Sequence, residues 1–174
     1  MSNVIWITGL SAAGKTTLGL LLVEHLRSAG KPAVLLDGDE LRAVFGVSAG
    51  YSEPERLDLA FKYSRLAKLI ACQGVLAVVS TVALFKSVHR WNRDNLPGYF
   101  EVYLKVSLEE LRRRDPKGLY RRYALGEERN VAGMDLKFDE PERPELIMEY
   151  VEGLNPEMQL EKLLETFNNF CKTN

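Results

Sequence analysis

One short run limits the fold of this 174-residue chain more than any other: GLSAAGKT, residues 9–16. It satisfies G-x-x-x-x-G-K-[ST], the P-loop pattern, in which glycines let successive backbone N–H groups converge on a phosphate. The apolar run VIWIT at 4–8 precedes it and indicates a buried strand, and residues 15–29 follow with helical spacing of leucines. A strand, this loop and a helix in that order predict an α/β protein that binds a nucleoside triphosphate.

Apolar runs and amphipathic segments alternate along the rest of the chain. Strands are expected at 33–37, 75–81, 100–106 and 144–150, and helices over 54–73, 107–114 and from Asn155-Pro156 onward. Such alternation predicts right-handed crossovers and a parallel sheet with helices on both faces, the three-layer sandwich of P-loop NTPases. No repeat or linker interrupts the pattern, so residues 1–174 are expected to form one domain.

Composition excludes several function classes. The formal net charge is -1 and 27% of residues are charged, and no extended basic face is visible. We therefore expect neither nucleic-acid nor membrane binding. The two cysteines, Cys72 and Cys171, form no CxxC, which argues against a zinc site or a disulfide framework. The first residues, MSNVIWITG, have no basic region and too short an apolar run for a signal peptide, so a cytoplasmic location is expected.

The P-loop predicts which residues contact the triphosphate. Lys15 is expected to neutralise the β- and γ-phosphate oxygens, and the Thr16 hydroxyl to ligate Mg²⁺, the cofactor expected with ATP as co-substrate. The residues expected to bind ATP phosphates are Gly9, Ser11, Ala12, Ala13, Gly14, Lys15, Thr16 and Thr17. No N-K-x-D element for reading guanine occurs, and motors need longer chains. A kinase of small molecules is therefore expected.

Two carboxylates follow the second predicted strand in the run DGDELR. Because ligands bind beyond the carboxyl ends of parallel strands, Asp37 and Asp39 are expected to face the P-loop. We predict that Asp39 accepts the proton of an attacking hydroxyl and that Asp37 is the metal-side carboxylate. The reverse order stays open, as does a structural role in which Asp39 caps the next helix.

Residues of roughly 112–140 are dense in arginine and lysine and contain glycines. Phosphoryl transfer depends on positioning and charge neutralisation, so a basic, glycine-hinged segment suits closure over the substrates. We call residues 112–140 the lid.

GLSAAGKTTL, LDGDELR, YSEPER and above all RDPKGLY resemble the adenylylsulfate (APS) kinase family, from Val4 to about Ile147. The resemblance implies transfer of the γ-phosphate of MgATP to the 3′-hydroxyl of adenosine 5′-phosphosulfate, giving PAPS, and a possible homodimer. By matching position it implies an acceptor site with Asp39, Arg42 and Arg56, and a base-stacking Tyr51. It also assigns Arg114 and Lys117 to the ATP side and the lid; Lys86, Lys117 and Val131 are further expected at the acceptor.

Four departures from the family pattern lie on the acceptor side. Leu59 stands where the family has an Asn, Val82–Lys86 replaces I-S-P-[FY]-R, Val131 replaces the adenine-stacking Phe, and Leu136–Pro141 replaces S-P-Y-E-x-P. Losing one aromatic face removes stacking worth roughly 1–3 kcal/mol, unless Phe138 or Tyr123 substitutes.

Together these departures indicate a rebuilt acceptor pocket beside a retained ATP side. The pattern resembles members of the family that phosphorylate other nucleotides, such as cytidine diphosphoramidate kinases, since binding a pyrimidine base needs less aromatic surface. APS, another nucleotide and a catalytically silent nucleotide-binding switch protein remain the alternatives.

Overall fold

A computed structural model describes residues 4–45 and 52–173. Its centre is a sheet of five parallel strands: β1 (Val4–Thr8), β2 (Ala33–Asp37), β3 (Leu76–Thr81), β4 (Tyr99–Lys105) and β5 (Leu146–Glu149). The strand order is β2-β3-β1-β4-β5, so the strand before the P-loop lies in the middle. The three-layer sandwich predicted from the sequence is confirmed.

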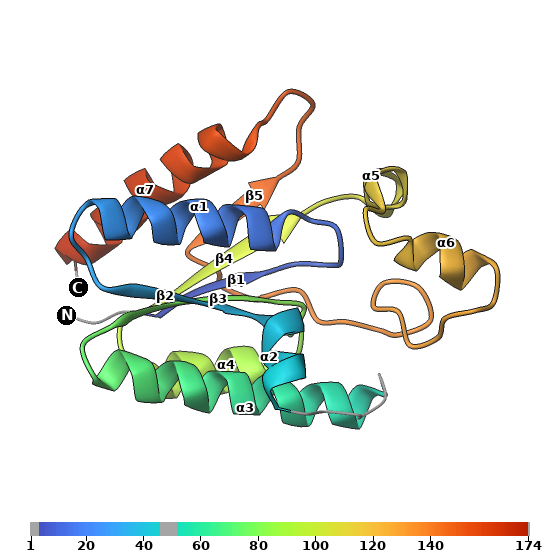
Figure 1. The fold of residues 1–174 in the computed structure, drawn as a ribbon, viewed down its shortest axis with the longest axis horizontal. Helices are drawn as coiled ribbons and strands as arrows, with labels where there is room; N and C mark the ends of the chain where they lie inside the picture. Colours follow the sequence, from blue (N-terminus) through green and yellow to red (C-terminus); the bar gives the residue numbers. More distant parts are fainter. Residues whose placement is uncertain (1–3, 46–51, 174) are drawn as a thin grey trace.

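Helices cover both faces of the sheet. In Figure 1, α1 (Lys15–Ser28) and α7 (Pro156–Thr173) lie on one face, and α3 (Glu53–Cys72) and α4 (Lys86–Asn95) on the other. Three short helices, α2 (Gly38–Val44), α5 (Leu108–Arg114) and α6 (Leu119–Ala124), lie toward the carboxyl ends of the strands. Of these seven helices, α2, α4 and α6 were not predicted from the sequence.

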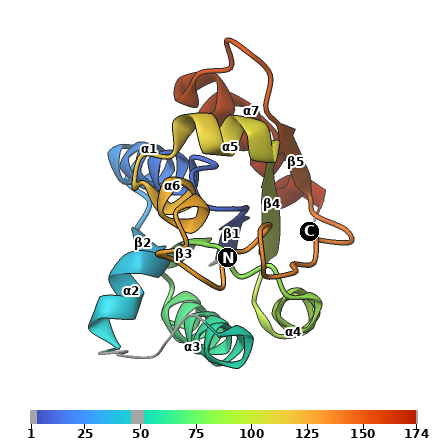
Figure 2. The ribbon, with the colours of Figure 1, turned by 90° about the vertical axis from the view of Figure 1, so that its right-hand side faces the viewer.

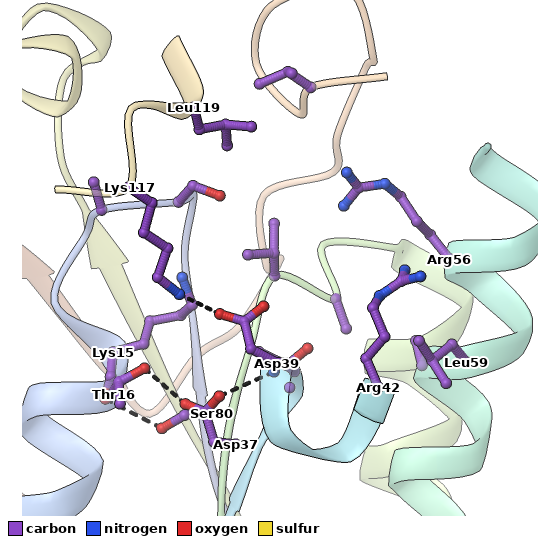
Figure 3. A pocket seen from close by; sticks show the side chains of 18 of the residues that line it. Lys15, Thr16, Asp37, Asp39, Arg42, Arg56, Leu59, Ser80, Lys117 and Leu119 are labelled. Carbon is purple, nitrogen blue, oxygen red and sulfur yellow. Dashed lines mark hydrogen bonds and ion pairs between the residues drawn. The ribbon is translucent and has the colours of Figure 1, made fainter. Parts of the chain in front are cut away.

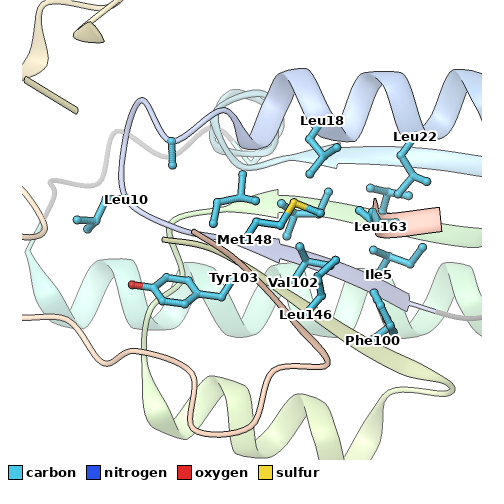
Figure 4. Packing of buried hydrophobic residues seen from close by; sticks show 14 of the residues in the cluster. Ile5, Leu10, Leu18, Leu22, Phe100, Val102, Tyr103, Leu146, Met148 and Leu163 are labelled. Atoms are coloured by element: carbon cyan, nitrogen blue, oxygen red, sulfur yellow. The ribbon is translucent and has the colours of Figure 1, made fainter. Parts of the chain in front are cut away.

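Strand β1 alternates its side chains between two cores. Ile5 and Ile7 pack among residues of α1 and α7, while Val4 and Trp6 pack among residues of α3. Figure 4 shows the first core, in which the leucines of α1 lie over the middle strands. All of β1 is buried, which explains its continuous apolar sequence.

Helix α7 docks through its aromatic residues. Phe167 meets Phe100 of β4 edge to face, with ring centroids 5.2 Å apart. Phe167 and Leu163 are buried, and Leu160, Leu164 and Phe170 pack against the same core. The helix predicted from Asn155-Pro156 onward is confirmed.

Candidate active site

The P-loop follows β1 and turns directly into α1. Gly9 has a φ of 154°, and a Cβ there would lie 2.7 Å from the carbonyl oxygen of Leu104, so only glycine fits. Gly14 caps α1 with a φ of 99°, and Ala12 has a φ of 65°. The loop is therefore held in the curled conformation that turns N–H groups toward one centre.

Lys15 starts α1 and is 9% exposed. Its ammonium donates to the carbonyl oxygen of Leu10, 2.8 Å away. Burial lowers the pKa of Lys15 to about 8, although Asp39 and Asp37 act in the opposite direction. A desolvated cation that lacks a full counter-charge is a strong binding point for phosphate oxygens.

Asp37 ends β2 and connects the P-loop helix to α2. One carboxylate oxygen accepts from the Thr16 hydroxyl at 2.7 Å, and the other accepts from the backbone N–H of Asp39 at 2.9 Å. Asp37 is therefore the N-cap of α2. The sequence had left open that Asp39 caps this helix. That alternative is wrong, because α2 begins at Gly38, two residues before a helix capped by Asp39 would begin.

Asp39 lies in the first turn of α2 and points into the cleft, where it pairs with Lys117 of the lid (Figure 3). Its side chain is 73% exposed. The two carboxylates thus differ sharply: Asp37 is buried against the P-loop helix, and Asp39 is accessible to an incoming molecule.

A cavity of about 460 Å³ joins the P-loop to α2, α3 and the lid. One face of α3 forms a wall of it, with Arg56, Leu59, Ala60 and Tyr63 at the spacing i, i+3, i+4, i+7. Arg42 of α2 lines the same side, and in Figure 3 both arginines approach it from the α2–α3 side. The structure brings these residues together with Lys15, Thr16, Asp37, Asp39, Lys117 and Val131, as predicted from the sequence.

Both halves of the lid line this cavity, the first through Lys117 and Leu119 and the second through Arg129 and Val131. Val131 lines it and is 2% exposed, and Asp135 accepts hydrogen bonds from the N–H groups of Asn130 and Val131 at 2.9 and 2.7 Å. Arg56 donates to the carbonyl oxygen of Asn130 at 2.8 Å. An acceptor-side arginine therefore holds the lid segment that carries Val131.

Several residues lining the cavity were not expected there, among them Tyr63, Phe85 and Arg129. Tyr63 and Phe85 are its aromatic side chains among the residues that the structure describes, and Arg129 adds a cation from the lid. Helical spacing could have predicted Tyr63, because it lies four residues, about one turn, after Leu59 on the same face of α3. Phe138 and Tyr123, considered as substitutes for the lost aromatic, instead pack against the core.

Other expected site residues lie elsewhere. Lys86 starts α4 outside the cavity, and its ammonium pairs with Glu142. Arg114 does not line the cavity; it approaches the P-loop from behind, with Nη1 3.5 Å from the carbonyl oxygen of Ala12. Tyr51 is outside the described residues.

The Thr16–Asp37 pair suits a divalent cation held mainly by phosphate. Magnesium bound with a nucleotide typically takes one or two protein oxygens and completes its shell with water and phosphate. The described residues contain no cluster of three or more His, Cys, Asp or Glu that could form a cage by themselves. A hydroxyl and a carboxylate 2.7 Å apart beside Lys15 fit that kind of shared site.

Comparison with known proteins agrees with this geometry. The family model for adenylylsulphate kinase matches residues 1–149. The chain belongs to the adenylylsulphate kinase family. It is accordingly an APS kinase-like, ATP-dependent nucleotide kinase, and the family's use of ATP implies a divalent metal.

Individual relatives carry two different names. A cytidine diphosphoramidate kinase of Campylobacter jejuni is 42% identical over 80% of this chain and 81% of its own length. A probable adenylyl-sulfate kinase of Archaeoglobus fulgidus is 38% identical over 86% and 96%. The Mycobacterium tuberculosis APS kinase in complex with AMPPNP and APS superposes with a TM-score of 0.89 at 29% identity, over 96% of this chain and 98% of that one. Within the described residues, no helix is both long and apolar enough to cross a bilayer.

Proposed function

We propose that this kinase transfers the γ-phosphate of ATP to a ribose hydroxyl of cytidine diphosphoramidate, with Asp39 as the base. The observation that carries the acceptor is the wall of the cavity, where Leu59 and Val131 stand at the positions of the family's Asn and Phe. The name of the relative that is 42% identical supports the same acceptor.

On the ATP side, the P-loop N–H groups and the Lys15 ammonium bind the phosphate oxygens. The Thr16 hydroxyl and the Asp37 carboxylate would hold Mg²⁺, which would supply positive charge against the phosphate oxygens. The short Thr16–Asp37 hydrogen bond supports Asp37, rather than Asp39, as the metal-side carboxylate.

On the acceptor side, Asp39 holds the proton that leaves the attacking hydroxyl. Its exposure to the cleft supports this role. Lys117 of the lid pairs with this carboxylate in the open cleft. Arg42, Arg56 and Arg129 supply the cations for a diphosphate-like group.

The described wall offers a base less aromatic surface than an adenine sandwich needs. Leu59 and Ala60 form an aliphatic strip, and Tyr63 uses its hydroxyl to donate to the carbonyl oxygen of Gly38 at 2.9 Å. A single-ring base loses less stacking on such a surface than a purine does. APS remains the second candidate because a relative at 38% identity is named for it.

An ADP-release assay across APS, cytidine diphosphoramidate and simple adenine and cytosine nucleotides tests the proposal. We expect the highest kcat/KM with the cytidine compound and a markedly lower value with APS. Robust turnover with APS at micromolar concentration would refute the proposed acceptor. If no nucleotide raises ADP release and a protein partner does, a regulated switch protein replaces the catalytic interpretation.

We further propose that residues 1–174 form one kinase domain, which the continuous sheet supports. The homodimer implied by the family resemblance stays a prediction, and light scattering of the purified protein tests it.

A further inference from the structure

Three successive carbonyl groups of the P-loop each lie close to a side-chain donor. The carbonyl oxygen of Leu10 accepts from Lys15 at 2.8 Å, and that of Ser11 accepts from the Tyr120 hydroxyl at 3.0 Å. The carbonyl oxygen of Ala12 lies 3.5 Å from Nη1 of Arg114. Two of these donors come from the RDPKGLY segment, more than 100 residues away along the chain.

Peptide geometry makes these carbonyl contacts matter for phosphate binding. A peptide unit is planar and trans, so its C=O and the N–H of the next residue point in opposite directions. Holding the Ser11 carbonyl outward therefore directs the N–H of Ala12 inward, toward the phosphate cradle. Ala12 has a φ of 65°, which costs free energy for a residue with a Cβ and needs support from its surroundings.

Tyr120 is built to hold that position. Its side chain is 3% exposed, and burial raises the pKa of its hydroxyl to about 12, so the group remains a donor throughout the neutral range. Asp115 fixes the helix that carries it, because its carboxylate accepts from the backbone N–H groups of Tyr120 at 3.2 Å and Arg121 at 2.9 Å. The donor is therefore placed by backbone as well as by packing.

We propose that Tyr120 is a positioning residue for the phosphate cradle, which acts through the Ser11 carbonyl to orient the N–H of Ala12. Through this contact the RDPKGLY segment supports the P-loop and also forms part of the lid. This inference rests on the proposed ATP site and is independent of which acceptor the enzyme uses.

The test compares Tyr120→Phe with Tyr103→Phe. Tyr103 is a matched control, because it is 4% exposed, lies in the same core and donates its hydroxyl to Glu140 at 3.1 Å, away from the P-loop. Calorimetric titration with ADP should show about tenfold weaker binding to Y120F, since a partly buried carbonyl loses its donor and the cradle loses its orientation. Y103F should bind ADP like the unchanged protein.

Two further measurements separate positioning from general destabilisation. The inhibition constant of AMP, which has no β-phosphate to place in the cradle, should be the same in Y120F and the unchanged protein. The KM for ATP should rise about tenfold while kcat at saturating ATP and the KM for the acceptor stay within about twofold.

Equal ADP affinity in Y120F and Y103F, or a parallel loss of AMP and ADP binding, would overturn the inference. Failure of the unchanged protein to bind ADP would overturn the ATP site and the inference with it. Should Y120F not fold, Asp115→Ala carries the same expectation for ADP and AMP, because it removes the carboxylate that places the backbone of Tyr120.

Discussion

Replacing Asp39 with asparagine removes one negative charge from the cleft and leaves the shape of the side chain unchanged. If Asp39 accepts the proton of the attacking hydroxyl, D39N should reduce kcat by about 10²- to 10⁴-fold, the usual contribution of a general base. ADP binding should persist, because neither Lys15 nor the P-loop backbone contacts this carboxylate through a hydrogen bond.

The effect on stability should be small. The side chains of Asp39 and Lys117 are 73% and 72% exposed, and such a pair contributes about 0–1 kcal/mol. For a domain of this size that corresponds to a change in melting temperature of at most about 4 °C. Asp37→Ala provides the contrast: it removes a helix N-cap and the partner of Thr16, and loss of the cap alone should cost about 1–2 kcal/mol.

The assay measures ADP release at saturating ATP and acceptor, together with ADP titration and thermal unfolding of both variants. A D39N enzyme that keeps turnover within tenfold of the unchanged protein would refute the assignment of the base. Loss of ADP binding in D39N would refute the separation of roles, because it would place Asp39 on the nucleotide side.

Three other variants test the electrostatics and the acceptor wall. Lys15→Met removes a cation whose pKa falls from 10.5 to about 8 on folding, so between these pH values the unfolded chain binds more protons than the folded one. The free energy of unfolding of the unchanged protein should therefore rise by about 3 kcal/mol relative to that of K15M between pH 8 and 10.5. Urea unfolding measures this difference, and a difference that does not vary with pH would contradict the prediction. Arg93→Met removes the cation that pairs with the carboxylate of Glu101, which is 1% exposed. The free energy of unfolding at neutral pH should fall by about 3 kcal/mol, because a buried charge is left unpaired. A loss below about 1 kcal/mol in urea unfolding would contradict this. Leu59→Asn combined with Val131→Phe should shift the ratio of kcat/KM values toward APS by roughly 5- to 100-fold through restored stacking, and an unchanged ratio would show that these positions do not select the base.

Local patterns in the sequence were sufficient for the sheet and the P-loop. The strands at Val4–Thr8 and Ala33–Asp37 were predicted with the bounds observed, because each is a short apolar run that ends at a glycine or a carboxylate. The P-loop could be placed because its residues are contiguous and its function depends on backbone geometry that glycine dictates.

The helices missing from the sequence prediction have weak local signals. Helix α4, KSVHRWNRDN, buries only Val88, His89 and Asn92, two of which are polar. Helix α6 has six residues and depends on Asp115 to cap it from outside its own first turn. Tertiary contacts, rather than apolar periodicity, stabilise both.

The candidate site was harder to predict where it depends on contacts between distant segments. The α3 stripe brings Arg56 to the carbonyl oxygen of Asn130, 74 residues later, and neither residue signals the other locally. Lys86 lies outside the cavity and pairs with Glu142, which no spacing rule connects to it. Position matching to a family identifies residue types, but the course of the chain decides which of them meet.

The order of the strands has a consequence for how such kinases diversify. The P-loop follows the central strand, whereas α2 and α3, which carry much of the acceptor wall, extend from β2 at the rim of the sheet. Figure 2, which looks onto the carboxyl ends, shows α2 and α3 grouped apart from α1 and α5. Changes in α2, α3 and the lid can therefore retune the accepted molecule while the P-loop after the central strand stays intact.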